Sequence, residues 1–148
     1  EGERKLKLAQ QSTVNWRLDV EAAMQLTGPL FWHDRARGKI EALPQIFGDV
    51  VLARKDVPTS YHLSVTVDDS KQGITLVTRG EDLFDSTHVH RLLQALLDYE
   101  TPEYFHHPII RDSSGRRYAK RDKSVTLKTM RERGKTPEEI MRNDLGLN

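Results

Sequence analysis

The sequence has no cysteine in its 148 residues, no apolar run long enough to cross a bilayer, and no signal-peptide pattern at its start. The absence of cysteine excludes disulfides and thiolate metal ligands within this chain and favours a reducing compartment. Aromatic residues are scarce at 7%, but 36% hydrophobic and 30% charged residues are typical of a globular domain and not of a disordered chain. We therefore expect a cytoplasmic globular protein with no membrane partner.

Net charge is also small, at +1, yet the two signs are separated along the chain. Between residues 81 and 110, Arg91 is the one basic residue against six acidic residues: Glu81, Asp82, Asp85, Asp98, Glu100 and Glu103. Between residues 111 and 133, nine basic residues stand against three acidic ones. A basic block of this kind can bind polyphosphate or a nucleic-acid backbone, and it can equally be a solvated surface. Charge alone leaves both interpretations open.

The first 45 residues carry the weakest structural signals. Alternating apolar residues over 16–20 predict a strand, and residues 20–26 predict a short helix that ends at Gly28. We expect the aromatic pair at 31–32 to be core or packing residues and the polar segment 33–39 to form a loop.

Regular patterns begin at residue 49. Branched apolar residues at 49–55, strict alternation at 61–67 and the apolar run at 74–80 predict three strands. An amphipathic helix over 85–97 follows the third strand directly, which is the βα arrangement of doubly wound sheets. A short last strand is predicted at 108–110. The fold class predicted from these patterns is α/β with an open sheet.

The C-terminal segment predicts two short helices after a tight turn at 113–115. The first begins near Ser124 and stops at Gly134. The second opens at Thr136, where 137–139 supply a proline at the first helical position and a capping-box glutamate.

Three local sequences, in this order, resemble the second half of the catalytic domain of class I glutamyl-tRNA synthetases. They are PTSYHLSVTVDD (58–69), GITLVTRGEDLFDSTHVHRLLQALL (73–97) and GRRYAKRDKSVTL (115–127). The third resembles the family's KMSKS loop, and its motif positions hold Arg117, Tyr118, Ala119, Lys120 and Arg121.

The resemblance implies the C-terminal half of a Rossmann-like catalytic domain, followed by a small helical segment like the family's stem-contact region. Residues 1–45 would be the remnant of a connecting or insert region, and residues 46–110 the C-terminal half of the catalytic domain. Residues 111–148 would hold the KMSKS-like loop and the short C-terminal helices.

The resemblance also implies roles for five residues. Arg79 would bind the side-chain carboxylate of glutamate, because the planar guanidinium matches a carboxylate with two hydrogen bonds. Tyr61 would hydrogen-bond the amino acid, although a strand tyrosine is more commonly a core residue. Lys120 would be catalytic and contact the ATP phosphates, whereas a lysine in a basic loop is otherwise a surface residue. Glu81 and Asp82 would lie against the ATP ribose, or equally mark a helix entry.

The sequence departs from the family's pattern at several points. Arg117 and Ala119 stand where the common motif has lysine and serine, and Val65 stands where many members have a polar residue that holds the amino acid. A HIGH-type motif and a cysteine-rich zinc site are both missing from this chain, so the resemblance puts them upstream. We therefore expect no zinc in this chain, half of the site for ATP and its Mg²⁺ counter-ion, and no activity for the chain alone.

The ends of the chain suggest which member of the family it resembles. It begins without methionine, which suggests a cut upstream, and it ends at Asn148 shortly after a capped helix, which suggests a natural end without an anticodon-binding domain. That favours the glutamyl-Q tRNA(Asp) synthetase type, a monomer that uses glutamate, ATP and tRNA to glutamylate queuosine in the tRNA(Asp) anticodon. The alternatives are a piece of a glutamyl-tRNA synthetase that charges tRNA(Glu), and a non-catalytic ATP- or RNA-binding module.

Histidine is the remaining candidate for a metal site, with six residues: His33, His62, His88, His90, His106 and His107. His88 and His90 are two positions apart on the predicted helix, so they point to different faces and cannot chelate one ion together. We expect no metal site.

Overall fold

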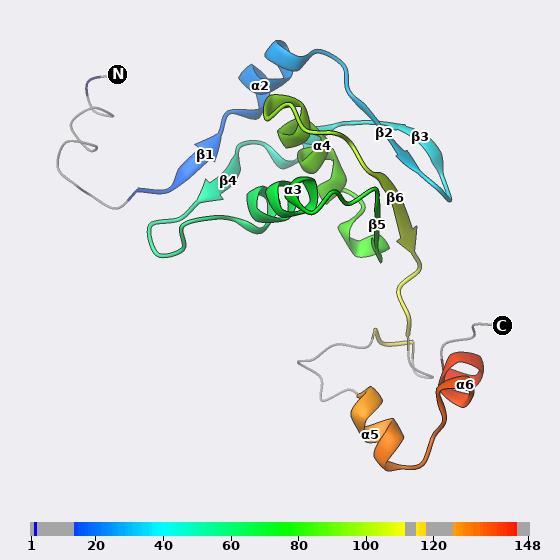
Figure 1. Ribbon diagram of the computed structural model, residues 1–148. Helices are drawn as coiled ribbons and strands as arrows, with labels where there is room; N and C mark the ends of the chain where they lie inside the picture. The colour runs from blue at the N-terminus through cyan, green and yellow to red at the C-terminus, as the bar shows by residue number, and fades with distance from the viewer. Residues whose placement is uncertain (1, 3–13, 112–114, 118–125, 145–148) are drawn as a thin grey trace. The chain divides into compact units, whose positions relative to one another are not determined.

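A computed structural model describes residues 2, 14–111, 115–117 and 126–144. The chain separates into two compact units, residues 1–107 and residues 108–148 (Figure 1). The elements of the first unit are β1 (Trp16–Leu18), α2 (Val20–Thr27), β2 (Phe31–Asp34), β3 (Gly38–Glu41), the 3-10 helix η1 (Pro44–Phe47), β4 (Val50–Ala53), α3 (Tyr61–Lys71), β5 (Leu76–Gly80), the 3-10 helix η2 (Glu81–Leu83), α4 (Ser86–Leu96) and β6 (Glu103–His107).

A four-stranded sheet in the order β3-β2-β6-β5 forms the centre of the first unit. β2 and β3 are an antiparallel hairpin, whereas β2, β6 and β5 run parallel to one another. β1 and β4 form a separate antiparallel pair. Because three strands are parallel, their carboxyl ends lie at one edge of the sheet, which is where open α/β sheets bind ligands. The α/β fold with a Rossmann-like sheet, expected from the sequence, is confirmed.

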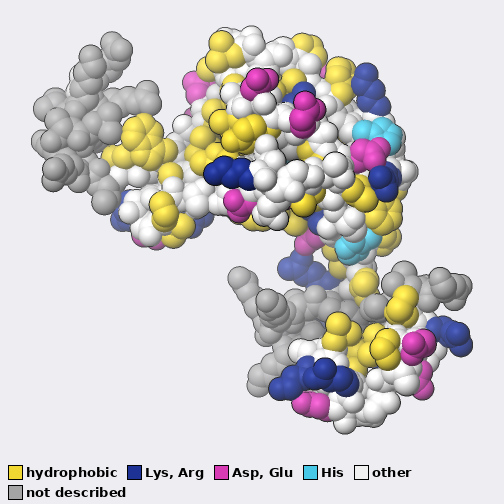
Figure 2. Space-filling view, viewed as in Figure 1, with side chains coloured by type: hydrophobic (Ala, Val, Ile, Leu, Met, Phe, Trp, Pro, Cys, Tyr) yellow, Lys and Arg dark blue, Asp and Glu magenta, His cyan; other side chains and the backbone are white. Residues whose placement is uncertain are grey.

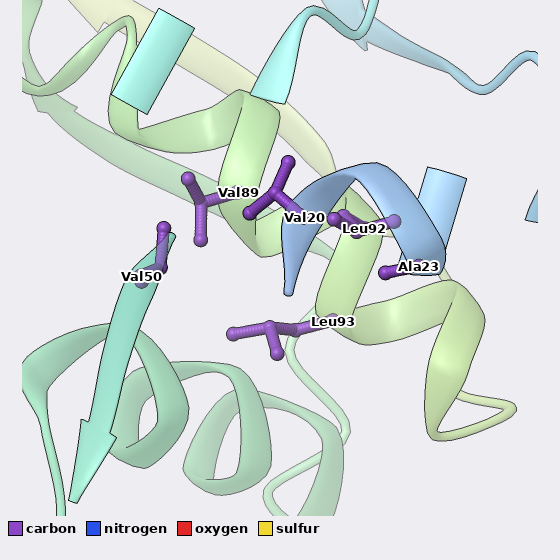
Figure 3. Packing of buried hydrophobic residues seen from close by; sticks show 6 residues of the cluster. All are labelled: Val20, Ala23, Val50, Val89, Leu92 and Leu93. Atoms are coloured by element: carbon purple, nitrogen blue, oxygen red, sulfur yellow. The ribbon is translucent and has the colours of Figure 1, made fainter. Parts of the chain in front are cut away.

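One apolar cluster joins α2, β4 and α4. Its buried members, which point toward one another in Figure 3, are Val20, Ala23, Val50, Val89, Leu92 and Leu93. The spacing of Val89, Leu92 and Leu93 gives α4 one apolar face, so burying that face against α2 fixes the helix in place. This confirms the helix predicted over 85–97, and Gly28 ends α2 as predicted.

A second cluster lies around Trp32, which is 3% exposed and packs with Tyr104 and Ala42. The Trp32 ring also meets Phe84 at a centroid distance of 5.0 Å and His106 at 5.7 Å. Its neighbour on β2 points the other way, and Phe31 is 43% exposed. Trp32 is therefore the core residue of the pair, while the Phe31 ring packs against the Lys39 ammonium group at 4.2 Å, since alternate residues of a strand face opposite sides.

Residues 61–67, predicted to be a strand, lie in the helix α3. Ser60 caps this helix by accepting a hydrogen bond from the backbone N–H of Leu63, and α3 packs against α4 (Figure 1). The alternating pattern predicted a strand wrongly because most side chains of α3 are half-buried, so neither face of the helix is clearly apolar. Its one buried side chain is polar: Thr66 donates a hydrogen bond to the carbonyl of His62, one turn earlier. A seven-residue pattern is too short to separate the two periods when both faces are partly covered.

Two further predictions in the first unit are wrong. Within residues 33–39 only 35–37 form a turn, closed by backbone N–H groups that donate to Asp34, and the residues on either side are strands of the β2–β3 hairpin. The last strand is β6 at 103–107 and not 108–110. The buried face of β6 is formed by Tyr104 and His106, and because histidine is not an apolar residue, this strand shows no alternation of apolar and polar residues in the sequence. The predicted strands near 16–18, 50–53 and 76–80 are confirmed.

The second unit contains α5 (Leu127–Glu132), α6 (Pro137–Glu139) and a π-helical turn at Ile140–Asp144. The predicted capping box is present: Thr136 accepts from the N–H of Glu139, and the Glu139 carboxylate accepts from the N–H of Thr136. The predicted helix start near Ser124 lies outside the described residues, and α5 is capped by Thr126. Figure 2 shows apolar side chains beside Lys and Arg on one face of this unit.

Candidate functional site

Three charged or titratable side chains lie at the carboxyl ends of the three parallel strands. Asp34 is the last residue of β2, Arg79 the fourth of five in β5, and His106 the fourth of five in β6. The register pairs Arg79 directly with His106. The sheet therefore brings a carboxylate, a guanidinium and an imidazole together at the edge where ligands bind in such folds.

Arg79 is half-buried and donates three hydrogen bonds to neutral groups. Its Nε donates to His106 Nε2 at 3.1 Å, its Nη1 to His90 Nδ1 at 3.2 Å, and its Nη2 to Thr87 Oγ1 at 2.5 Å. Thr87 and His90 are three positions apart on α4, so they present both acceptors on one face of the helix. The guanidinium lies 5.5 Å from the centre of the Tyr104 ring.

The bonding of Arg79 leaves donors for a ligand. A guanidinium carries five N–H donors, and three are used, so one N–H remains on each terminal nitrogen. Among the described residues no carboxylate lies within salt-bridge distance of Arg79. Burial raises the pKa of Asp69, and the charge of Arg79 offsets part of that rise, so this carboxylate interacts with Arg79 at a distance and not through an ion pair.

Behind Arg79, His106 donates from Nδ1 to Asp34 Oδ2 at 2.7 Å, and both side chains are fully buried. Burial alone would raise the pKa of Asp34, but hydrogen bonds from the His106 side chain and from the backbone N–H groups of Ala36 and His106 lower it overall. Burial lowers the pKa of His106 and the nearby Arg79 lowers it further, while the bond to Asp34 opposes the shift. At neutral pH the pair is thus a carboxylate and a neutral imidazole.

On its other side Arg79 bonds to a second pair of histidines. His90, which is 2% exposed, lies with Nε2 3.0 Å from Nδ1 of His62. Burial, then the charge of Arg79, lowers the pKa of His90 to about 3. Burial and Arg79 also lower the pKa of His62. The ring of Tyr61 packs edge-on against His90 at 5.8 Å, so Tyr61 and Arg79 both contact one imidazole.

An open pocket of about 500 Å³ adjoins this cluster. Its lining includes Tyr61 and His62 together with Phe47, Arg17 and Arg54. Tyr61 is 52% exposed, so its phenol ring is available to a ligand there. Aromatic rings beside two arginines suit a ligand that is anionic and partly planar.

With this geometry established, comparisons with known proteins identify the family. Residues 3–147 match the family model of the class I tRNA synthetases (E and Q), catalytic domain. The chain belongs to this family. The resemblance inferred from the three local sequences is thereby confirmed.

Relatives of two kinds are similar to this synthetase chain. A glutamyl-Q tRNA(Asp) synthetase of Rhodobacter capsulatus is 44% identical over 137 residues, which cover 89% of the chain and 48% of the relative. The glutamate–tRNA ligase 2 of Syntrophus aciditrophicus is 30% identical over 95% of the chain and 28% of the relative. A crystal structure of a glutamate tRNA ligase from Elizabethkingia meningosepticum, in complex with its amino acid, matches with a TM-score of 0.67 at 30% identity, over 82% of the chain and 24% of the ligase. The chain thus spans half or less of the length of these relatives.

The residues expected to contact ATP lie only partly within the described residues. Glu81 and Asp82 lie in the 3-10 helix directly after Arg79's strand, both exposed, and Glu81 lies 3.5 Å from Arg37 across the surface. Of the KMSKS-like motif, Tyr118, Ala119, Lys120 and Arg121 lie outside the described residues. Arg117 forms an isolated antiparallel bridge with Arg111. The roles assigned to these residues stay predictions.

Among the described residues no group of three or more histidine and acidic side chains is arranged to hold a metal ion. In the histidine cluster the ring nitrogens of His90 and His106 are committed to Arg79, Asp34 and His62. A metal ion would have to displace those bonds.

Sequence reasoning did not identify Asp34, Thr87, His90 and His106 as parts of this site. It considered the histidines as metal ligands and not as acceptors for an arginine. One signal was available: Thr87 and His90 are spaced by three on the helix that follows Arg79's strand directly, so one helix face must look toward that strand's end. Asp34 has no such signal, because it lies 45 residues before Arg79 in the sequence.

Proposed function

We propose that Arg79 is the clamp for the side-chain carboxylate of glutamate, in an enzyme that activates glutamate with ATP and transfers it to tRNA. The observation that carries the proposal is the state of the guanidinium: it is half-buried, it bonds to three neutral acceptors, and one N–H on each terminal nitrogen is unused. A partly desolvated charge with no carboxylate in direct contact is costly, and a carboxylate bound by two N–H groups reduces that cost.

The neighbours of Arg79 support a ligand with a single negative charge. Because the pKa values of His90 and His106 are lowered, neither imidazole carries charge at neutral pH. Asp34 is separated from Arg79 by His106, so it compensates the guanidinium only in part. Tyr61 would contact the amino-acid part of the ligand from the rim of the adjoining pocket.

For the RNA substrate we propose queuosine in the anticodon of tRNA(Asp). Relatives named glutamyl-Q tRNA(Asp) synthetase reach 44% and 40% identity over more than four-fifths of the chain. Charging of tRNA(Glu) is the second candidate, because glutamate–tRNA ligases match at 30% to 35% identity. In both cases Lys120 would stabilise the charge that develops on the ATP phosphates.

The amino-acid site is tested with Arg79→Lys in the complete gene product, by glutamate-dependent ATP–pyrophosphate exchange with and without tRNA. Lysine keeps the charge but loses the fork, so the KM for glutamate should rise roughly 10- to 100-fold, the equivalent of a hydrogen bond to a charged group. Arg35→Lys is the matched control, since Arg35 pairs with Glu103 at 2.7 Å on the exposed surface. An unchanged KM for glutamate in Arg79→Lys would refute the clamp.

The RNA substrate is tested by supplying the same protein with glutamate, ATP and purified tRNA. Glutamylation of tRNA(Asp) that carries queuosine, and none of tRNA(Asp) that lacks it, is the expected result. Charging of tRNA(Glu) at its 3′ end, with none on tRNA(Asp), would establish the second candidate. A protein that binds RNA but shows no exchange and no transfer would be the non-catalytic module.

A further inference from the structure

The buried pair of Asp34 and His106 lies directly behind Arg79, and neither residue is part of the adjoining pocket's lining. We propose that Asp34 and His106 are positioning residues: Asp34 fixes the imidazole of His106 in one tautomer, so that its Nε2 always offers Arg79 an acceptor and orients the guanidinium fork. The inference rests on the proposed role of Arg79 as the glutamate clamp. It assigns a purpose to two residues outside the expected site.

The position of the proton on the His106 ring follows from which neighbouring groups can donate or accept a hydrogen bond. Arginine only donates, so His106 Nε2, 3.1 Å from Arg79 Nε, must be the bare nitrogen. The ring proton is then on Nδ1, where it meets the carboxylate of Asp34 at 2.7 Å. In the opposite tautomer, with the proton on Nε2, the His106 N–H would face the Nε–H of Arg79. Asp34 would also lose its shortest hydrogen bond, the one from Nδ1. The carboxylate thereby selects the acceptor that Arg79 needs.

The hydrogen bonds that Asp34 makes with the backbone do not depend on this imidazole. Asp34 Oδ1 already closes the hairpin turn by accepting from the backbone N–H groups of Ala36 and Arg37. Oδ2 is met by the backbone N–H of His106 at 3.2 Å, whatever side chain that residue carries. The ring packs against Trp32 and Tyr104 in the core, and its two nitrogens also link a fixed carboxylate to the guanidinium.

Thr87 completes the positioning. Its hydroxyl lies 3.2 Å from His106 Nε2 and accepts from Arg79 Nη2, so Nε and Nη2 on one edge of the guanidinium both meet neutral acceptors. With that edge bound, and His90 bound to Nη1, the plane of the guanidinium cannot turn freely. A clamp held in this way loses little side-chain entropy when a carboxylate arrives.

The first test is Asp34→Asn in the complete gene product. Asparagine exchanges one acceptor oxygen for an N–H donor, which drives the His106 proton from Nδ1 to Nε2, against Arg79. Long-range ¹H–¹⁵N correlation of the histidine rings should show that move. In steady-state exchange, the KM for glutamate should rise about tenfold or more, while the KM for ATP stays within about twofold. Glu103→Gln makes the same atom exchange on the strand that carries His106, and should change neither constant.

His106→Asn and His106→Gln separate the two halves of the link, and they remain informative if the Asp34 variant folds poorly. Asparagine places an N–H near the position of Nδ1 and keeps the bond to Asp34, but offers Arg79 no acceptor. Glutamine places its carbonyl near the position of Nε2 and keeps an acceptor for Arg79, but loses Asp34. We expect the KM for glutamate to rise about tenfold in the first and by less than about threefold in the second.

Each result decides the matter. A proton that stays on Nδ1 in Asp34→Asn, or one that moves while the KM for glutamate is unchanged, overturns the inference. Equal effects of asparagine and glutamine at position 106 also overturn it, because a merely structural residue would not distinguish them. If Arg79→Lys itself has no effect on the KM for glutamate, the proposed function fails; if only the Asp34 and His106 variants have none, the clamp stands and the positioning role falls.

Discussion

Acid should destabilise this protein well above the pH at which its carboxylates become protonated, because His90 is buried beside Arg79. The pKa of His90 is about 3 in the folded protein, against 6.5 for a free histidine. Below pH 6.5 the imidazole of His90 therefore binds a proton in the unfolded chain but stays neutral in the folded chain. Stability from this group is complete above pH 6.5, falls as the pH decreases, and is lost by about pH 3.

The magnitude follows from one proton per molecule. Each pH unit inside that window costs about 1.4 kcal/mol, so His90 alone should remove about 3 kcal/mol between pH 6.5 and pH 4. Burial also lowers the pKa values of His62, His88 and His106, which adds to the loss in the same direction. Domains of this size have about 5–15 kcal/mol in total, so the effect is a large fraction of the stability.

The assay is urea unfolding at half-unit steps from pH 7 to pH 4, with the free energy of unfolding plotted against pH. His90→Gln should flatten the slope by about 1.4 kcal/mol per pH unit. Leu93→Met, a buried neutral change on the same helix, is the control and should shift the line by less than about 1.5 kcal/mol without changing its slope. Parallel slopes for the wild type and His90→Gln would refute the assignment of His90 as a buried neutral group.

Three smaller predictions concern core packing and helix capping. Trp32→Ala should lower the free energy of unfolding by about 3–5 kcal/mol, since Trp32 is the centre of the second core cluster; a loss below about 1 kcal/mol in urea unfolding would contradict that position. Ser60→Ala should cost about 1 kcal/mol by removing the cap of α3, and Ser60→Thr should retain most of it; equal losses in thermal melts would argue against the cap. Thr136→Ala should speed amide exchange in the turn that follows, because it removes one half of the capping box with Glu139; unchanged exchange there would mean that the box does not hold that turn.

Local chemistry was sufficient for several elements of this protein. The capping box at Thr136, the stop at Gly28 and the one-sided apolar face of α4 each involve residues within a few positions of one another, so the sequence determines them directly. The order of three local motifs was likewise sufficient to identify the family. Arg79 and Tyr61 were singled out by that resemblance, and the structure brings both against His90.

Tertiary contacts decided the rest. Residues 61–67 alternate like a strand, but packing on α4 and the Ser60 cap make them a helix. The polar segment 33–39 is part of a hairpin because Asp34 closes its turn and pairs with β6. In both cases a local cap or turn acts together with a distant packing partner, and the pattern of apolar and polar residues did not reveal that combination.

The surroundings of Arg79 are the clearest case of what tertiary structure alone decides. Its hydrogen-bond partners come from α4 and β6, and Asp34 of β2, which bonds to His106, lies 72 positions before it in the sequence. No spacing rule links them, because the parallel pairing of β2, β6 and β5 is what brings the three strand ends together. The sequence by itself determined which residue carries the positive charge. Only the folded sheet determined that this charge is held by neutral acceptors and left with donors for an anion.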